Sequence, residues 1–206
     1  MSPMVEQRNL KRRVVKLGGS LLSNPRLTAA VGAWLARQPA AQNLVVVGGG
    51  ETVEAMRNLS RLFPLDDVAM HWRCVRLLRA TFEIFAELFP DWQPVAQCER
   101  LEELLKVSPR PGEWLIAVDA FYSPGTHDAG LPVGWETTTD AIAAYLARLA
   151  AADELVLLKS CPIPAEGSPE DPKAGSLRRL TEAGIVDRAL ATALPRDLPL
   201  RVEQLP

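Results

Sequence analysis

Short apolar runs alternate with longer segments of helical periodicity along most of the chain. The runs have the length of buried strands and are rich in valine and leucine, which is typical of strands covered on both faces. They lie at residues 13–17, 44–47, 114–118, 154–158 and 198–202. This alternation predicts a mainly parallel sheet covered by helices.

The segments between the runs repeat their apolar residues every three or four positions, as amphipathic helices do. They lie at residues 25–38, 51–63, 66–89 and 137–151. In the longest of them Arg73, Arg76 and Arg79 lie opposite the apolar positions, either as a solvated face or as a rim that attracts an anionic substrate. The same helix has more apolar surface than one sheet face would cover, so we expect a homodimer or a larger homo-oligomer.

Length and charge narrow the class of protein. The chain has 206 residues, a formal net charge of −2 and a pI near 5.8. We expect one α/β domain at residues 12–206 after an N-terminal tail at residues 1–11. The balanced charge does not predict a nucleic-acid surface. No window resembles a signal peptide or a membrane span, so we expect a cytoplasmic protein that binds no membrane.

Other features carry less information. The cysteines and histidines lack metal-ligand spacing, so we expect no metal site built from these side chains. A proline-rich segment at residues 161–172 has few backbone donors for a sheet and is expected on the surface.

Two glycine clusters directly follow the first two predicted strands. A strand that ends in glycines before a helix brings N–H groups and a positive helix terminus to one spot, where protein backbones bind phosphate. The residues concerned are Gly18, Gly19 and Ser20 in the first cluster and Gly48, Gly49 and Gly50 in the second. Lys16 adds a cation beside the first cluster. The spacing matches neither a Walker A loop nor GxGxxG, and a tight turn is the alternative reading of Gly-Gly-Ser.

A third group of polar residues starts the predicted helix at residues 137–151. Hydroxyls and carboxylates in such a position cap the helix, and Thr138, Thr139 and Asp140 suit that role. If the helix start faces the glycine clusters, which parallel strands would place at one sheet edge, Asp140 pairs with Lys16 and the hydroxyls bind substrate. Capping alone and capping combined with function both fit this segment.

Taken in order, these segments resemble the amino acid kinase superfamily, which includes acetylglutamate, aspartate, carbamate and uridylate kinases. The matching segments are Val15-Lys16-Leu17-Gly18-Gly19-Ser20, Val47-Gly48-Gly49-Gly50-Glu51 and Thr138-Thr139-Asp140-Ala141-Ile142-Ala143. The likeness covers residues 12–190 and is greatest to a small branch that phosphorylates an aminomethylfuran phosphate in methanofuran biosynthesis. In that branch a histidine also opens the long helix, as His71 does here, and a tryptophan precedes the Thr/Ser-Asp segment, as Trp135 does.

The resemblance implies a three-layer α/β/α sandwich with an open, mainly parallel sheet. It also implies that Lys16 stabilises a transferred phosphoryl group, that Asp140 organises this lysine, and that Gly18, Gly19, Gly48 and Gly49 donate N–H groups to phosphate. Substrate would lie over the glycine triplet and the long helix, where the candidate contacts are Glu51, His71, Thr138 and Thr139. ATP with Mg²⁺ would be the cosubstrate.

The nucleotide half departs from the family pattern. Family members follow the strand equivalent to residues 154–158 with a Thr-Asp-Val-Asp-Gly type of turn, whereas this chain continues Lys159-Ser160-Cys161-Pro162. Both acids are missing, and Lys159 is either a nucleotide phosphate ligand or a charged strand end. No Gly-Thr element follows residues 198–202, so we expect a domain truncated at its C-terminus.

Three hypotheses about function follow. The first is an active ATP-dependent kinase of a small metabolite in methanofuran-type one-carbon cofactor biosynthesis. This metabolite either carries a phosphate already or does not. The second is a non-catalytic relative that binds a phosphorylated metabolite or serves as a regulatory or structural subunit. The third is an interaction module without a small ligand.

Overall fold

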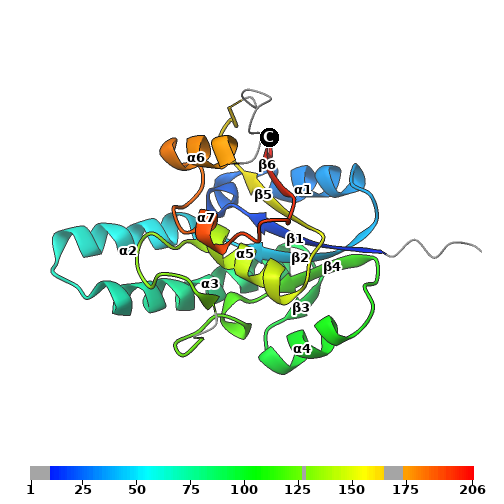
Figure 1. Ribbon diagram of the computed structural model, residues 1–206, viewed down its shortest axis with the longest axis horizontal. Helices are drawn as coiled ribbons and strands as arrows, with labels where there is room; N and C mark the ends of the chain where they lie inside the picture. The colour runs from blue at the N-terminus through cyan, green and yellow to red at the C-terminus, as the bar shows by residue number, and fades with distance from the viewer. Residues whose placement is uncertain (1–9, 127–128, 165–173) are drawn as a thin grey trace, which may run out of the picture.

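The structure is a computed structural model that describes residues 10–126, 129–164 and 174–206. Residues 1–9 of the predicted tail, and most of the predicted proline-rich surface segment, lie outside these ranges. Figure 1 shows the path of the chain.

The described strands form one parallel sheet in the order β3-β4-β2-β1-β5-β6. They are β1 (Lys11–Leu17), β2 (Ala41–Val47), β3 (Gln93–Val95), β4 (Gly112–Ile116), β5 (Glu154–Lys159) and β6 (Leu200–Gln204). The central strand β2 is buried along its whole length. Helices therefore cover both faces of the sheet, which explains why its strands form continuous apolar runs.

Two hydrophobic cores lie on opposite faces of the sheet. Along β1 the side chain of Val14 belongs to one core and those of Val15 and Leu17 belong to the other. The first core includes α5 (Thr139–Leu149) and α7 (Leu190–Ala193), and the second includes α1 (Leu27–Ala36). These layers confirm the predicted three-layer α/β/α sandwich.

The long helix α3 (Asp67–Leu88) contributes to both cores and forms a hairpin with α2 (Gly50–Leu62). Figure 1 shows this hairpin extending past the sheet on the left. In α2 no residue is buried, because the helix packs on α3 but projects away from the sheet. No helix among the described residues is long and apolar enough to cross a membrane.

Several helices and strands differ from those that the sequence periodicity predicted. The predicted strand at residues 198–202 begins two residues later, and the one at 114–118 begins earlier, at Gly112. Strand β3 was not predicted, because it is a short edge strand of three residues in which Pro94 interrupts the pattern. The helices that were not predicted are α4 (Cys98–Lys106), α6 (Ala174–Glu182) and α7, with the 3₁₀ helices η1 (Gly19–Ser23) and η2 (Val118–Ala120).

The register of the sheet places three loops side by side. Leu17 of β1 pairs with Val47 of β2 and with Leu158 of β5. Since the strands are parallel, the segments that follow all three leave the same edge of the sheet, where ligands of open α/β folds bind. These segments contain the two glycine clusters and Lys159.

Candidate active site

The two glycine loops pack directly on one another. The N–H of Gly48 donates to the carbonyl of Leu17 at 2.9 Å, and a Cβ built on Gly19 would lie 1.9 Å from the backbone nitrogen of Gly50. Gly50 itself has a φ of +54°, in the left-handed region that side chains disfavour. The glycines therefore permit close backbone contact between the loops, and this contact goes beyond a tight turn in either loop alone.

These contacts also decide which N–H groups are available to a ligand. The N–H of Gly18 donates to the carbonyl of Leu158 at 2.8 Å, and that of Gly48 is used as described above. The expectation that Gly18 and Gly48 donate to phosphate is therefore wrong for these two N–H groups. Gly49, by contrast, is the N-cap of α2, and the first N–H groups of a helix have no partner within it.

Two lysines share one buried carboxylate at this edge. Nζ of Lys16 lies 2.9 Å from Oδ1 of Asp140, and Nζ of Lys159 donates to Oδ2 of the same carboxylate at 2.6 Å. The side chains are 6%, 11% and 3% exposed for Lys16, Lys159 and Asp140. The predicted contact between Lys16 and Asp140 is present, and Lys159 joins it. We call these three residues the lysine–aspartate cluster.

The cluster holds more positive than negative charge. Burial alone would raise the pKa of Asp140, but the adjacent Lys16 and Lys159 outweigh burial and lower it. Burial lowers the pKa of Lys159, and repulsion from Lys16 lowers it further. Oδ1 of Asp140 accepts no well-aligned hydrogen bond from the described residues, so the Lys16 contact is ionic. An ammonium group has three donors, which leaves Lys16 able to bind an anionic ligand.

The start of α5 is organised by capping, as the sequence suggested. Thr138 is the N-cap, and its hydroxyl accepts from the N–H of Asp140 at 3.4 Å. Asp187, which the sequence analysis missed, accepts from the N–H and hydroxyl of Thr138 and from the N–H of Ala141. Burial and the charge of Asp140 raise the pKa of Asp187. Capping thus fixes the helix start that carries Asp140 into the cluster.

A cavity of about 210 Å³ opens beside Lys16. Its walls come from both glycine loops, from α2 and α3, and from the loop before α5. The predicted site residues among its lining are Lys16, Gly19, Gly48, Gly49, Gly50, His71, Thr138 and Thr139. Arg57, Cys74 and Trp135 also line it, and the sequence analysis did not assign Arg57 or Cys74 to the site.

Other predicted site residues lie around the cavity without lining it. The Ser20 hydroxyl lies 2.7 Å from that of Ser160, which joins the first glycine loop to the segment after β5. Glu51 is exposed and accepts from the Ser23 hydroxyl at 3.2 Å. Asp140 and Lys159 stand behind Lys16. None of the three arginines of α3 discussed above lines this cavity, and Arg79 instead pairs with Asp119 at 2.7 Å.

His71 is buried in the wall of the cavity with both ring nitrogens engaged. Nδ1 lies 3.1 Å from the carbonyl of Gly134, and Nε2 lies 3.0 Å from the hydroxyl of Tyr122. A carbonyl can only accept, so Nδ1 donates and Nε2 accepts from Tyr122, which is a neutral imidazole. Burial lowers the pKa of His71, consistent with that form, and raises the pKa of Tyr122 to about 12.

The fold is similar to those of several solved kinase structures, although the sequence itself has no match. The sequence matches no protein-family model and no curated protein. Uridylate kinase from Archaeoglobus fulgidus superposes with a TM-score of 0.61 at 20% identity, over 94% of this chain and 90% of that one. UMP kinase from Bacillus anthracis gives 0.60 at 16% identity, over 96% and 88%. Aspartate kinase from Synechocystis gives 0.65 at 17% identity, over 94% of this chain and 38% of that one. The chain has the amino acid kinase fold.

The amino acid kinase fold explains why the candidate residues meet. In this fold the loops after β1, β2 and β5 share one edge, so Lys16, the glycine triplet and Lys159 converge although more than 100 residues separate the first from the last. Asp187 and Arg57 could not be assigned from the sequence, because one acts through a cap and the other through a cavity wall. The hydroxyl-rich helix start, Thr137 to Thr139, was the sequence signal for a capped helix, and Asp187 contributes to that cap.

Proposed function

We propose that this protein is an ATP-dependent phosphotransferase that acts on a small metabolite. The observation that carries the proposal is the lysine–aspartate cluster, whose Lys16 lines a cavity that both glycine loops also line. A phosphoryl group in transfer spreads negative charge over its oxygens, and enzymes assist mainly with fixed donors and cations. The amino acid kinase fold, shared with two uridylate kinases and an aspartate kinase, supports the same class of reaction.

The phosphate end of ATP fits the residues at this edge. Gly19 and Gly48 both line the cavity, and a Cβ on either would meet the backbone of the other loop, so the loops present backbone and no side chain at these positions. Lys16 and Lys159 would hold the phosphates with the N–H of Gly49. ATP, when bound, supplies the phosphoryl group, and Mg²⁺ would be carried by its phosphates, since no group of acidic, histidine or cysteine side chains able to hold a metal occurs among the described residues.

Each residue of the cluster has a distinct role in this proposal. Lys16, which lines the cavity, contacts the transferred group and neutralises the charge that develops on it. Asp140 contacts both Lys16 and Lys159 and positions them, and its charge opposes the lowering that burial causes in the pKa of Lys159. Lys159 is the last residue of β5, at the position where the family pattern begins its nucleotide-seating turn, and we assign it to the phosphates of the nucleotide.

A non-catalytic binding protein is the second candidate, and the segment after β5 favours it. This segment reads Lys-Ser-Cys-Pro and has neither acid of the usual turn. Calorimetric titration with ATP and ADP in the presence of Mg²⁺ separates the candidates. Saturable nucleotide binding supports the kinase. If nucleotide fails to bind at millimolar concentration while a thermal-shift screen finds a phosphorylated metabolite that binds, the protein is a binding or regulatory member of the fold; failure of both favours the interaction module.

The resemblance to the methanofuran branch suggests the acceptor to test first. We propose an aminomethylfuran phosphate, which would place the protein in one-carbon cofactor biosynthesis and in the cytoplasm. Its support is the order of the motifs, with His71 and Trp135 both reaching the cavity. ADP release that requires this acceptor, and that does not occur with UMP or aspartate, is the expected result.

We also propose that the protein forms a homodimer through the α2–α3 hairpin. Large apolar side chains remain exposed along it, and Leu62 and Phe63 at its tip are 74% and 55% exposed. The others are Leu59, Leu65, Val68, Ile84 and Leu88. Several exposed apolar side chains on one helical hairpin are typical of an interaction surface. Light scattering after size exclusion tests it, and a species of 22.5 kDa contradicts it.

A further inference from the structure

Arg57 lines the cavity, and the protein engages its guanidinium only in part. It projects from α2 into the wall of the cavity that Lys16 also lines. Its Nε is buried and makes no hydrogen bond within the described residues, and Glu54 lies 3.6 Å from its Nη1, beyond hydrogen-bond distance. A buried guanidinium N–H without a partner is costly, because it has lost water and gained nothing in return. A ligand that accepts from this N–H would remove that cost.

The surroundings of Arg57 hold it in place without satisfying it. Its guanidinium carbon lies 5.3 Å from the ring centroid of Trp135, close enough for a cation–π contact. The indole Nε1–H of Trp135 donates to Oδ1 of Asp67 at 3.0 Å, which fixes the ring between α2 and the start of α3. The charge of Arg57 also reaches Cys74 across the cavity, where it opposes the rise that burial causes in the pKa of that thiol. The guanidinium is therefore held against Trp135 in the wall of the cavity, and its Nε–H makes no hydrogen bond to the described residues.

The cavity that Arg57 and Lys16 line also has apolar side chains in its walls. The apolar side chains there are Val53, Val75, Leu78 and Ile142. The single carboxylate in the lining, Glu54, is half exposed and also contacts Arg61 at 3.3 Å, so it neutralises Arg57 only in part. The cavity lining thus combines two cations, Lys16 and Arg57, with apolar side chains. Its volume of about 210 Å³ is below the ~300–1,000 Å³ of drug-sized ligand pockets, which restricts it to a small molecule.

We infer that Arg57, stacked on Trp135, binds an acidic group of the phosphate acceptor, and that the acceptor is a small anion with an apolar or aromatic body. The inference rests on the proposed function, because it takes the Lys16 end of the cavity as the place where phosphoryl transfer occurs. A guanidinium binds carboxylate and phosphate oxygens through two parallel N–H groups, so either group suits Arg57. The acidic group would lie at Arg57, the apolar body on the aliphatic wall, and the accepting oxygen or nitrogen toward Lys16.

Calorimetry without nucleotide tests this inference separately from the kinase proposal. The probes are phenyl phosphate, benzoate and benzyl alcohol, which share a ring and differ in charge. Arg57→Gln removes the cation, and Arg61→Gln is the matched control, because Arg61 lies one turn further along α2, contacts the same Glu54 and is 63% exposed outside this cavity. Thermal denaturation checks that both variants fold.

We expect phenyl phosphate and benzoate to bind the unaltered protein more tightly than benzyl alcohol does. Arg57→Gln should weaken both anions by about tenfold or more, as loss of a charge-assisted pair predicts, and Arg61→Gln should change them by less than about twofold. The tighter of the two anions identifies the natural acidic group as phosphate or carboxylate.

Three results would overturn the inference. The first is equal affinity for the two anions and for benzyl alcohol, and the second is an equal loss of anion affinity in the two arginine variants. The third is loss of anion binding in Lys16→Ala but not in Arg57→Gln, which would place the anion in the glycine loops. Since no ATP is present, failure here leaves the kinase proposal standing. Absence of phosphoryl transfer, conversely, leaves an Arg57-dependent binding result standing.

Discussion

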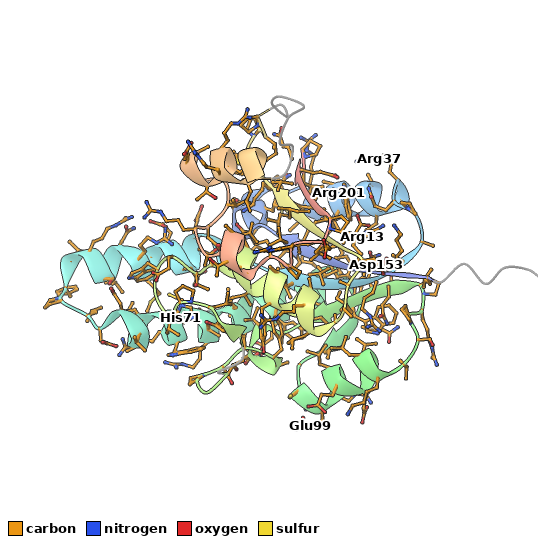
Figure 2. All side chains as sticks on the ribbon, in the orientation of Figure 1. Arg13, Arg37, His71, Glu99, Asp153 and Arg201 are labelled. Atoms are coloured by element: carbon orange, nitrogen blue, oxygen red, sulfur yellow. The ribbon has the colours of Figure 1, made fainter. Side chains whose placement is uncertain are left out.

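The two ends of β1 carry buried cations that differ in how many of their hydrogen-bond donors the protein uses. At the start of the strand, Arg12 donates to Gln42 and to the carbonyls of Ala150 and Val107, and Arg13, which is 1% exposed, donates to Glu154 and Asn43. Figure 2 shows Arg13 and Asp153 together at this end, well separated from His71 on the far side of the molecule. At the other end Lys16 has one ionic contact, to Asp140, and faces a cavity.

This difference separates structural charge from charge kept for a ligand. A buried cation whose donors are all used by the protein stabilises the packing around it and has nothing left to offer. A buried cation with unused donors beside a cavity is costly to the fold unless something binds there.

The largest effect is expected from Lys16→Ala. Loss of the cavity-facing cation should reduce phosphoryl transfer by at least about 10³-fold, equivalent to about 4 kcal/mol of transition-state stabilisation. The fold should persist, because Asp140 keeps Lys159 as its partner. ADP release with ATP and the aminomethylfuran phosphate acceptor measures activity. Lys11→Ala, on an exposed lysine of the same strand, is the control and should be unaffected. Unchanged turnover in Lys16→Ala would show that its role is misassigned.

Arg13→Met should have the opposite profile, with a large loss of stability. It leaves Glu154 and Asn43 as buried acceptors without their donor, and breaking a buried pair from one side costs about 3–5 kcal/mol. Arg201 contacts the other oxygen of Glu154 at 3.3 Å and is 35% exposed, so Arg201→Met should cost about 1 kcal/mol or less. Urea denaturation gives both values. Similar losses in the two variants would remove the distinction between satisfied and exposed partners.

The two ends of β1 differ in how much of their structure could be predicted from the sequence. The candidate site residues Lys16, Asp140 and the glycines follow from local motifs, because strand-glycine-helix junctions and caps are short-range features. The structural network around Arg12 and Arg13 was not predicted, because its partners lie 26 to 141 residues away and carry no motif. Arg57 was not predicted either, because only the structure shows that it lines the cavity with an Nε–H that makes no hydrogen bond to the described residues.

Lys159→Met tests whether the second lysine of the cluster is held at a cost to stability. Its pKa is lowered by burial and by Lys16, which means that the folded protein disfavours its charge. The variant leaves Lys16 and Asp140 as a one-to-one pair, so the free energy of unfolding should stay equal or rise by up to about 1 kcal/mol, while phosphoryl transfer falls. Urea denaturation and the ADP assay are run on the same preparation. A loss of stability above about 2 kcal/mol would instead make Lys159 a structural partner of Asp140.

The smallest effect concerns His71, which lines the cavity yet resembles Arg13 in having every donor and acceptor engaged. Burial lowers its pKa, so below the ordinary value of about 6.5 the unfolded chain takes up a proton that the folded chain refuses. Stability should therefore fall as the pH falls from 6.5 toward 5.5, by up to about 1.4 kcal/mol per pH unit. His71→Gln can still donate and accept but does not titrate, and its slope in urea denaturation should be flatter.

The comparison of slopes isolates His71 from the other buried groups. Asp187, with its raised pKa, acts in the opposite direction, because between about 3.9 and that raised value acidification favours the folded state. Asp140, with its lowered pKa, loses its contribution only at pH values below about 3.9. Both carboxylates are present in the two proteins, so their effects cancel in the difference. Equal slopes would mean that the imidazole protonates as readily in the folded chain, and that His71 has freedom to bind a substrate after all.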